Sequence, residues 1–334
     1  MRSTRPLLIA SATAFGLALV TGCASSSESS DDAGKVVGSV ERGPEKEVRQ
    51  SGDSLKVVAL GWSDGEIAAD LGVTPEAIYD WQGHGEDNQG VGPWAQDSVA
   101  DADIEVIENS GTTYNYEQIE LMEPDLILNV RAASDEKVFD RLSKIAPVAS
   151  APEDAPDFAV DWRAQTEIIG EAIGREEEAS DAVEETDKII RAAAGDYPEF
   201  EGRTFAYGAK FGDAYGGYVK GDARFDVFGE LGFVENPALA KLKPSGGFFA
   251  NVAAEQVTAF DADVAVLTTI GLPLKELEQD RKIASLDVVE DDRAIILDEK
   301  DEVNAALAAG TPQSIGIAVE EITPELQQAV AKVD

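Results

Sequence analysis

The chain has 334 residues, and 65 acidic against 27 basic side chains give it a formal net charge of −38. Nucleic acid is therefore excluded as a partner, because its phosphates would be repelled. Apolar residues make up 43% of the chain, which is typical of a folded soluble protein, and a single cysteine means that disulfide bonds do not support the fold. Any anionic ligand would need local Arg or Lys side chains to overcome the acidic background.

Residues 1–22 have the features of a signal peptide. Arg2 and Arg5 precede an apolar run over residues 7–20, which is too short for a transmembrane helix. The run ends in Val20-Thr21-Gly22-Cys23, which resembles the lipobox of bacterial lipoproteins. That resemblance implies that Cys23 carries palmitate and other acyl chains and holds the protein on the extracellular face of the cell membrane. An ordinary signal peptide, or a membrane stub, with an incidental cysteine is the alternative.

Residues 23–54 are rich in Ser, Glu, Asp, Gly and Lys. We expect a flexible tether here, because so few large apolar side chains cannot offset the loss of chain entropy on folding. A short strand around residues 36–40 is the structured alternative at the end nearest the folded part. Roughly 280 residues follow, which suits two lobes better than one compact core.

Residues 55–160 are predicted to form an N-terminal α/β lobe, because strand and helix patterns alternate along them. The expected strands are 55–60, 77–81, 126–130 and 147–149, and the expected helices are 66–71 and 136–145. Residues 82–94 contain four glycines and the only histidine and should form a loop. This alternation favours a parallel sheet flanked by helices.

Residues 161–195 are predicted to be two linker helices, 161–173 stopped by Gly174 and 175–194 stopped by Gly195. The second would be about 30 Å long, which is enough to bridge two lobes; a surface helix of the first lobe is the alternative. Alternation then resumes in a C-terminal α/β lobe, 196–334. Its expected strands are 203–209, 264–268 and 294–297, and its expected helices are 225–231, 302–309 and 323–333.

One sequence pattern occurs once in each half of the chain, at residues 116–128 and again 138 residues later at 254–266. Each copy reads as one or two helical turns, a turn with Asp and a short apolar strand. The apolar helix positions should face inward, so Glu117 and Glu255 should point to water. The pattern indicates two similar lobes and one partner that touches both, although chance similarity between helix–strand units would also explain it.

The chain resembles the iron–siderophore substrate-binding lipoproteins of ABC importers, in the same class as the vitamin B12 and ferric hydroxamate binding proteins. The segments that carry this resemblance are residues 56–64, 72–73, 79–81, 90–92, 117–128 and 145–148. It implies two Rossmann-like lobes joined by a single long helix, a monomer, and a ferric siderophore bound in the cleft between the lobes. It also implies that Glu117 and Glu255 dock onto arginine clusters of the ABC permease subunits.

The ligand site should lie in loops after the carboxyl ends of the strands, where open α/β sheets bind ligands. Aromatic rings there would face the organic shell of a chelate, and Arg or Lys would meet its oxygen atoms. The candidates are Trp62, Trp81, Trp94, Arg131, Lys210, Tyr215, Tyr218, Arg224 and Phe248. Core packing is the alternative role for each aromatic residue.

Other ligands and functions are weighed against this one. Capture of a free metal ion is disfavoured because His84 is the only histidine, and we expect no cofactor. Haem or a corrinoid is the alternative ligand, since a Tyr can be an axial haem ligand, and a sensor without transport is the alternative role. An enzyme is disfavoured, because a hydrolase would have no cysteine nucleophile and no Gly-x-Ser-x-Gly elbow.

Overall fold

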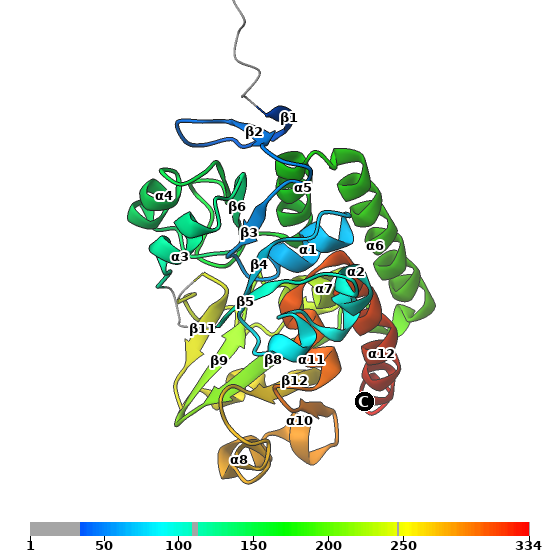
Figure 1. Ribbon diagram of the computed structural model, residues 1–334. Coiled ribbons are helices and arrows are strands. Elements are labelled where there is room, and N and C mark those ends of the chain that lie inside the picture. The colour runs from blue at the N-terminus through cyan, green and yellow to red at the C-terminus, as the bar shows by residue number, and fades with distance from the viewer. Residues whose placement is uncertain (1–33, 109–112, 246, 334) are drawn as a thin grey trace, which may run out of the picture. The chain divides into compact units, whose positions relative to one another are not determined.

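The computed structural model describes residues 34–108, 113–245 and 247–333 (Figure 1). The predicted signal peptide and Cys23 lie outside the described residues. The strands from residue 57 onward form two sheets, and the chain passes from the first to the second once, through two helices. None of the helices in the described part is long and apolar enough to cross a membrane.

The first sheet has the order β5-β4-β3-β6-β7, and every neighbouring pair is parallel, as predicted. Its strands are β3 (Val57–Ala59), β4 (Ala77–Asp80), β5 (Glu105–Glu108), β6 (Leu126–Asn129) and β7 (Val148–Ser150). Its helices are α1 (Asp64–Asp70), α2 (Gln96–Val99), α3 (Tyr116–Leu121) and α4 (Glu136–Leu142), with 3-10 turns η1 (Glu86–Asn88) and η2 (Pro93–Ala95). The central strands are buried along their length, which explains their continuous apolar runs.

The second sheet is mixed, with the order β11-β9-β8-β12-β13 and a short β10 beside β8. Its strands are β8 (Thr204–Phe211), β9 (Ala214–Tyr218), β10 (Val234–Glu235), β11 (Phe249–Val252), β12 (Val264–Thr269) and β13 (Ala294–Leu297). Strands β8, β12 and β13 run parallel, whereas β9 runs antiparallel to both of its neighbours, β8 and β11. The predicted alternation of strands and helices therefore holds for the centre of this sheet. The sequence patterns did not indicate the antiparallel strands β9 and β11.

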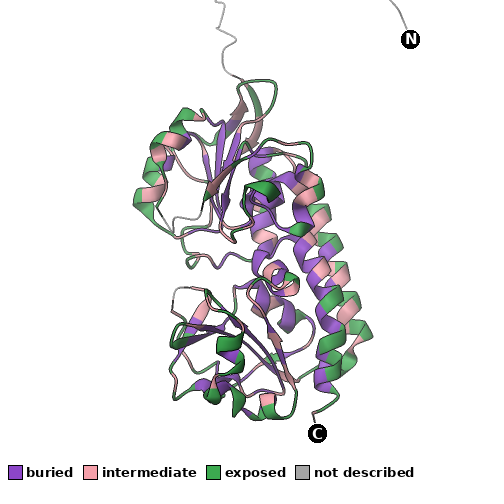
Figure 2. Ribbon diagram, turned by 60° about the horizontal axis from the view of Figure 1, so that its bottom comes forward, coloured by how far each residue is buried: buried purple, intermediate pink, exposed green. Residues whose placement is uncertain are grey.

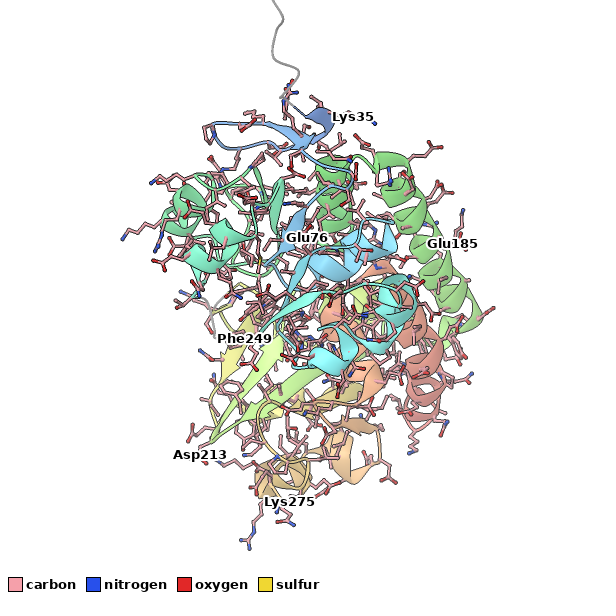
Figure 3. The ribbon with its side chains drawn as sticks, in the orientation of Figure 1. Lys35, Glu76, Glu185, Asp213, Phe249 and Lys275 are labelled. Carbon is pink, nitrogen blue, oxygen red and sulfur yellow. The ribbon has the colours of Figure 1, made fainter. Side chains whose placement is uncertain are left out.

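Helices α5 (Trp162–Ile173) and α6 (Glu176–Asp196) connect the sheets. Asp161 caps α5 by accepting hydrogen bonds from the backbone N–H groups of residues 163 and 164, and Gly174 ends it in the left-handed conformation. Helix α6 packs against α5, α7 (Ala223–Glu230) and α12 (Pro312–Val330), and its outer face is exposed (Figure 2). Glu185 extends from that outer face into solvent (Figure 3).

Five helices follow β12 in the described C-terminal part of the chain. Helices α8 (Lys275–Glu278), α9 (Arg281–Ala284) and α10 (Asp287–Glu290) lie between β12 and β13, and α11 (Glu302–Ala309) precedes α12. The 3-10 turn η4 (Val257–Phe260) comes before β12. Helix α12 begins eleven residues earlier than the predicted 323–333, because Thr311 and Ser314 form a reciprocal capping box and Pro312 occupies the first turn.

Residues 35–50 do not form the flexible tether that was expected. Strands β1 (Lys35–Ser39) and β2 (Glu47–Gln50) pair in an antiparallel hairpin that contacts α5. Val40 and Val48 are buried in the main core, at 6% and 0% exposed. Because these side chains are buried against other elements, a few of them are enough to hold the hairpin in an ordered conformation. The strand considered around residues 36–40 is thus present as part of this hairpin.

Candidate functional site

A cleft of about 620 Å³ lies where loops of the first sheet meet the second sheet. Six of the nine candidate ligand residues line it, namely Trp62, Trp81, Trp94, Tyr218, Arg224 and Phe248. The other lining residues are Gln82, Gly83, His84, Pro93, Thr268, Thr269, Ile270, Glu299, Lys300, Glu302, Asn304, Ala305 and Ala308. The first group of loops follows β3 and β4 at their carboxyl ends, which is the position expected for a ligand site in an α/β sheet.

Trp62 lies at the centre of an aromatic stack. Its ring is 4.4 Å from that of Trp81 with an angle of 7° between the planes, and 4.4 Å from that of Phe158 with an angle of 28°. Phe248, from the second half of the chain, meets Trp62 edge-on at 5.7 Å. Trp62, Trp81 and Phe248 are only partly buried, so they offer flat apolar surface to a ligand.

The opposite wall is built around Arg224 at the start of α7. Its guanidinium lies over the ring of Tyr218 at 3.6 Å and donates two hydrogen bonds of 2.7 Å to the carboxylate of Asp222. Asp222 is fully buried, so this bidentate pair is shielded from water. Arg224 therefore reaches the cleft with its charge already compensated by a carboxylate.

Arg131 lies beneath the aromatic stack rather than among the lining residues. Its guanidinium is 5.6 Å from the ring centre of Trp62 and donates hydrogen bonds of 2.9 Å to the carbonyl oxygens of Ala308 and Ala309. Its Nη2 is 3.6 Å from Oδ2 of Asp222. The side chain is buried and joins the loop after β6 to the end of α11. Its contacts indicate that it holds the two halves of the cleft together.

Trp94 and the loop that carries it are held by a buried carboxyl group that the sequence did not single out. Glu66 accepts hydrogen bonds from Nε1 of Trp94, at 3.0 Å, and from the backbone N–H of Gly92, at 2.8 Å. Burial raises the pKa of Glu66 to about 7, although these hydrogen bonds act in the opposite direction. A Glu in the first turn of a helix usually faces water, so its sequence position gave no signal of this role.

His84 is in the same loop, with its ring 5.8 Å from Trp94 in an edge-on arrangement. Its backbone N–H and those of Gly83 and Gly85 donate to the carboxylate of Asp80, which shapes the loop. Burial lowers the pKa of His84. The described residues contain no group of three or more His, Cys, Asp or Glu side chains arranged to hold a metal ion.

Lys210 and Tyr215 lie away from the cleft. Both side chains bond Asp280 (Nζ to Oδ2 at 2.6 Å, and the tyrosine hydroxyl to Oδ2 at 2.5 Å). Burial opposes ionisation of Asp280, but these hydrogen bonds lower its pKa to about 2. The reason for their position is strand alternation: Tyr207 on β8 and Tyr218 on β9 face the main core, whereas Lys210 and Tyr215 are on the other face of the same strands.

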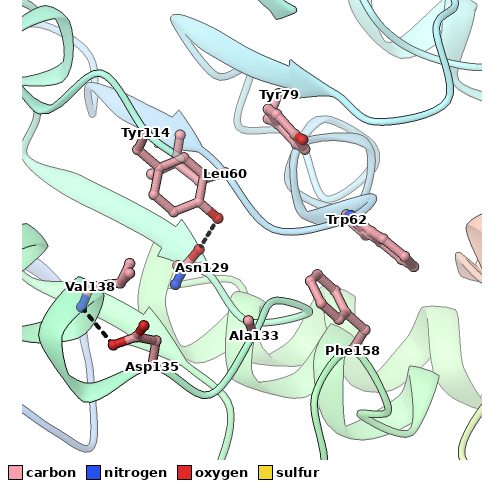
Figure 4. Close-up of a pocket in the computed structure, with 9 residues that line it drawn as sticks. All are labelled: Leu60, Trp62, Tyr79, Tyr114, Asn129, Ala133, Asp135, Val138 and Phe158. Atoms are coloured by element: carbon pink, nitrogen blue, oxygen red, sulfur yellow. Dashed lines mark hydrogen bonds between the residues drawn. The ribbon is translucent and has the colours of Figure 1, made fainter. Parts of the chain in front are cut away.

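A smaller pocket of about 60 Å³ opens on the other side of Trp62 (Figure 4). The rings of Trp62 and Phe158 line it together with Tyr114, whose hydroxyl donates to Oδ1 of Asn129 at 2.9 Å. Phe158 was not among the candidates, although an isolated aromatic residue directly after the Pro- and acid-rich residues 151–157 was a usable signal. It adopts φ 57°, a left-handed conformation that the sequence does not reveal.

Glu117 and Glu255 are both exposed, as predicted, while Ile119 and Val257 next to them are buried. Glu117 is in the first turn of α3. Glu255 lies in the turn before η4, which is a 3-10 turn and not the α-helical turn that was expected. The two segments therefore have the same pattern of exposed and buried residues, and each is followed by a strand. They differ in that the first is an α-helix and the second a 3-10 turn.

The sequence and the fold agree on the family. Residues 57–300 match the family described as periplasmic binding protein. The chain belongs to the periplasmic binding protein family. It is therefore a solute-binding protein of the kind that works outside the cytoplasm, and not an enzyme. No curated protein sequence matches the chain significantly.

Several solved structures share the fold. A periplasmic solute binding protein from Mycobacterium smegmatis is 23% identical with a TM-score of 0.74, over 88% of this chain and 99% of that one. PiaA from Streptococcus pneumoniae in complex with ferrichrome is 21% identical with a TM-score of 0.70, over 86% and 97%. SirA from Staphylococcus aureus complexed with staphyloferrin B is 21% identical with a TM-score of 0.66, over 86% and 97%.

Proposed function

We propose that this protein captures a ferric siderophore outside the cytoplasm and delivers it to the permease of an ABC importer. The observation that carries the proposal is the aromatic cleft, where Trp62, Trp81 and Phe248 present flat faces from both halves of the chain. A siderophore brings its iron already wrapped in an organic shell, so recognition requires surface complementarity and no metal ligands from the protein. PiaA and SirA, which share the fold, were solved with ferrichrome and staphyloferrin B.

The location at the membrane is part of the same proposal. The lipobox-like sequence at Cys23 supports lipid attachment at the extracellular face, with residues 24–33 between the lipid and the hairpin. Exposed Glu117 and Glu255 are the candidate contacts with arginine side chains of the permease, since Arg–carboxylate pairs fix orientation as well as adding affinity. The protein is proposed to act as a monomer.

The tyrosines of the cleft favour a siderophore over haem. An axial tyrosine ligand binds haem iron as tyrosinate. Of the described tyrosines, only Tyr218 lines the cleft; burial raises its pKa, although the nearby guanidinium of Arg224 acts in the opposite direction. Tyr215, the other tyrosine considered for this site, bonds Asp280 instead.

The experiment is a binding titration followed by tryptophan fluorescence and calorimetry. Iron-loaded siderophores of the hydroxamate, catecholate and carboxylate types are each added to the purified protein, with haemin and cyanocobalamin as comparison ligands. We expect at least one ferric siderophore to bind with micromolar or tighter affinity and to quench the fluorescence, while its iron-free form binds weakly. Binding of haemin or cyanocobalamin alone, or of no ligand in the series, would refute the proposal.

A further inference from the structure

The charges of the cleft identify the type of siderophore that fits. The lining residues include two basic side chains, Arg224 and Lys300, and two acidic ones, Glu299 and Glu302. His84 adds no positive charge, because burial lowers its pKa. The lining as a whole therefore carries no excess of positive charge, within a chain whose formal net charge is −38.

The buried basic residues nearest the cleft are already paired with other groups, whereas Lys300 in the lining is exposed. Arg224 uses Nε and Nη2 on the carboxylate of Asp222. Arg131 donates to backbone carbonyl groups of α11 and shares Asp222, and Lys210 bonds Asp280 on the far face of the sheet. An anionic ligand that drew Arg224 away from Asp222 would leave that buried carboxylate with one cation fewer, and loss of one member of a buried pair is strongly destabilising.

Neutral contacts, in contrast, are plentiful. Trp62, Trp81, Phe248 and Tyr218 supply apolar faces. Thr269 is fully buried at the cleft wall, and its hydroxyl has no hydrogen-bond partner in the described part of the chain. Its hydroxyl can donate to an oxygen atom of a ligand, since an unpaired buried hydroxyl is unfavourable until it is bonded.

Siderophore chemistry links these observations to a ligand class. Each hydroxamate group has one negative charge, so three of them neutralise ferric iron and leave a neutral complex, or a cationic one if an amine is present. Catecholate groups have two negative charges each, and carboxylate siderophores also form anionic complexes. We infer that this cleft takes a neutral or cationic ferric trihydroxamate and discriminates against anionic ferric complexes; the inference rests on the proposed function, since it concerns the ligand of the same site.

The test is a calorimetric comparison of four ferric complexes in one buffer: ferrichrome, ferrioxamine B, ferric staphyloferrin B and a ferric tris-catecholate. We expect ferrichrome or ferrioxamine B to bind at least about a hundredfold more tightly than either anionic complex, because like charges in a desolvated site are strongly unfavourable. Tighter binding of an anionic complex would overturn the inference and leave the proposed function standing. Binding of none of the four would refute the proposed function itself.

A charge-reversal pair shows whether charge is the cause. Glu302 lies in the first turn of α11 at the cleft and is exposed, and Glu276 is an exposed residue in the first turn of α8 that does not line the cleft. Glu302→Lys should raise the affinity for ferric staphyloferrin B about tenfold, and more than it changes the affinity for neutral ferrichrome. Glu276→Lys alters the net charge equally and should change neither. Equal effects of both variants, or none from Glu302→Lys, would contradict a local charge filter.

Discussion

The indole ring of Trp62 lies flat against that of Trp81, with 4.4 Å between the ring centres and 7° between the planes. The two residues follow neighbouring parallel strands, β3 and β4, and so their loops meet at one edge of the sheet. Trp62 is also stacked on Phe158 and touched by Phe248. A ligand that enters the cleft therefore meets a preformed aromatic surface instead of four independent side chains.

We predict that Trp62→Ala weakens binding of the preferred ferric siderophore by about tenfold or more. The substitution removes the central ring of the stack. Trp81 and Phe158 then lose their stacking partner, and the ligand loses a contact surface. Trp162→Phe is the matched control, because Trp162 is buried in α5 away from the cleft and its Nε1 has no hydrogen-bond partner to lose among the described residues. Calorimetric affinities of the two variants make the comparison. An unchanged affinity of the Trp62→Ala protein would show that the aromatic stack does not contribute to ligand binding.

Much of this site was predictable from the rule that ligands bind at the carboxyl ends of parallel strands. Trp62 and Trp81 satisfy that rule. Tyr218 ends β9, which runs antiparallel to β8, and Arg224 lies at the start of α7, so the rule does not account for these two. Lys210 and Tyr215 satisfied it equally well, and their actual position depends on which face of the strand each occupies. A shift of one residue in the strand moves each side chain to the other face of the sheet. A single sequence with weak alternation of apolar and polar residues does not define that register.

Removal of the Arg131 side chain should lower the free energy of unfolding substantially. Arg131→Leu leaves the carbonyl groups of Ala308 and Ala309 without their donor and Asp222 with one cation fewer, in a buried setting. Loss of one member of a buried pair typically costs about 3–5 kcal/mol. Urea denaturation measures this difference.

Arg191→Leu is the control for that experiment. Arg191 is 63% exposed and pairs with Asp187 at 3.5 Å on α6, so the same substitution should cost less than about 1 kcal/mol. Similar losses in the two variants would show that the contacts of Arg131 have no special role in stability.

Stability should fall as the pH rises from about 4.5 to about 7. Burial raises the pKa of Glu66 to about 7 from an ordinary value of 4.5, and it raises those of Asp64 and Asp226 to about 6. In this pH range the folded protein holds protons that the unfolded chain releases, so the free energy of unfolding decreases with pH. Glu66→Gln should reduce that slope. Denaturation at several pH values measures it, and a slope equal to the wild-type value would contradict the assignment. Glu185→Gln, at an exposed position on α6, should leave the slope unchanged.

The elements of the fold differ in how well the sequence indicates them. Helix α5 was predicted within one residue, because Asp161 and Gly174 mark its two ends by side-chain capping and by a left-handed turn. Strands β9 and β11 were missed, because Gly216 and Gly217 in β9 are typical of turns. These glycines are accommodated by tertiary packing: a Cβ on Gly217 would meet the side chain of Leu239.

Replacement of Glu117 and Glu255 should separate binding from transport. Both side chains are exposed, and neither lines the cleft. We expect Glu117→Gln combined with Glu255→Gln to leave the siderophore affinity within about twofold and to reduce uptake of radiolabelled iron by cells about tenfold, because two charge-assisted contacts are lost. Glu120→Gln, at an exposed position on the same helix as Glu117, is the control and should support normal uptake. Normal uptake by the double variant would refute the docking role.

Gly38 and Gly52 offer a paired test of whether the N-terminal hairpin belongs to the fold. A Cβ on Gly38 would overlap the carbonyl oxygens of Glu171 and Ala172 in α5, whereas a Cβ on Gly52 would meet no atom within 4 Å. Backbone atoms at the end of a helix cannot move aside cheaply, so Gly38→Ala should separate the hairpin from α5 and expose Val48, which is 0% exposed in the structure. We expect a loss of about 1–3 kcal/mol in urea denaturation and faster proteolysis of residues 35–50. Gly52→Ala should show neither effect, and a Gly38→Ala protein as stable as this control would mean that the hairpin contributes nothing to the folded state.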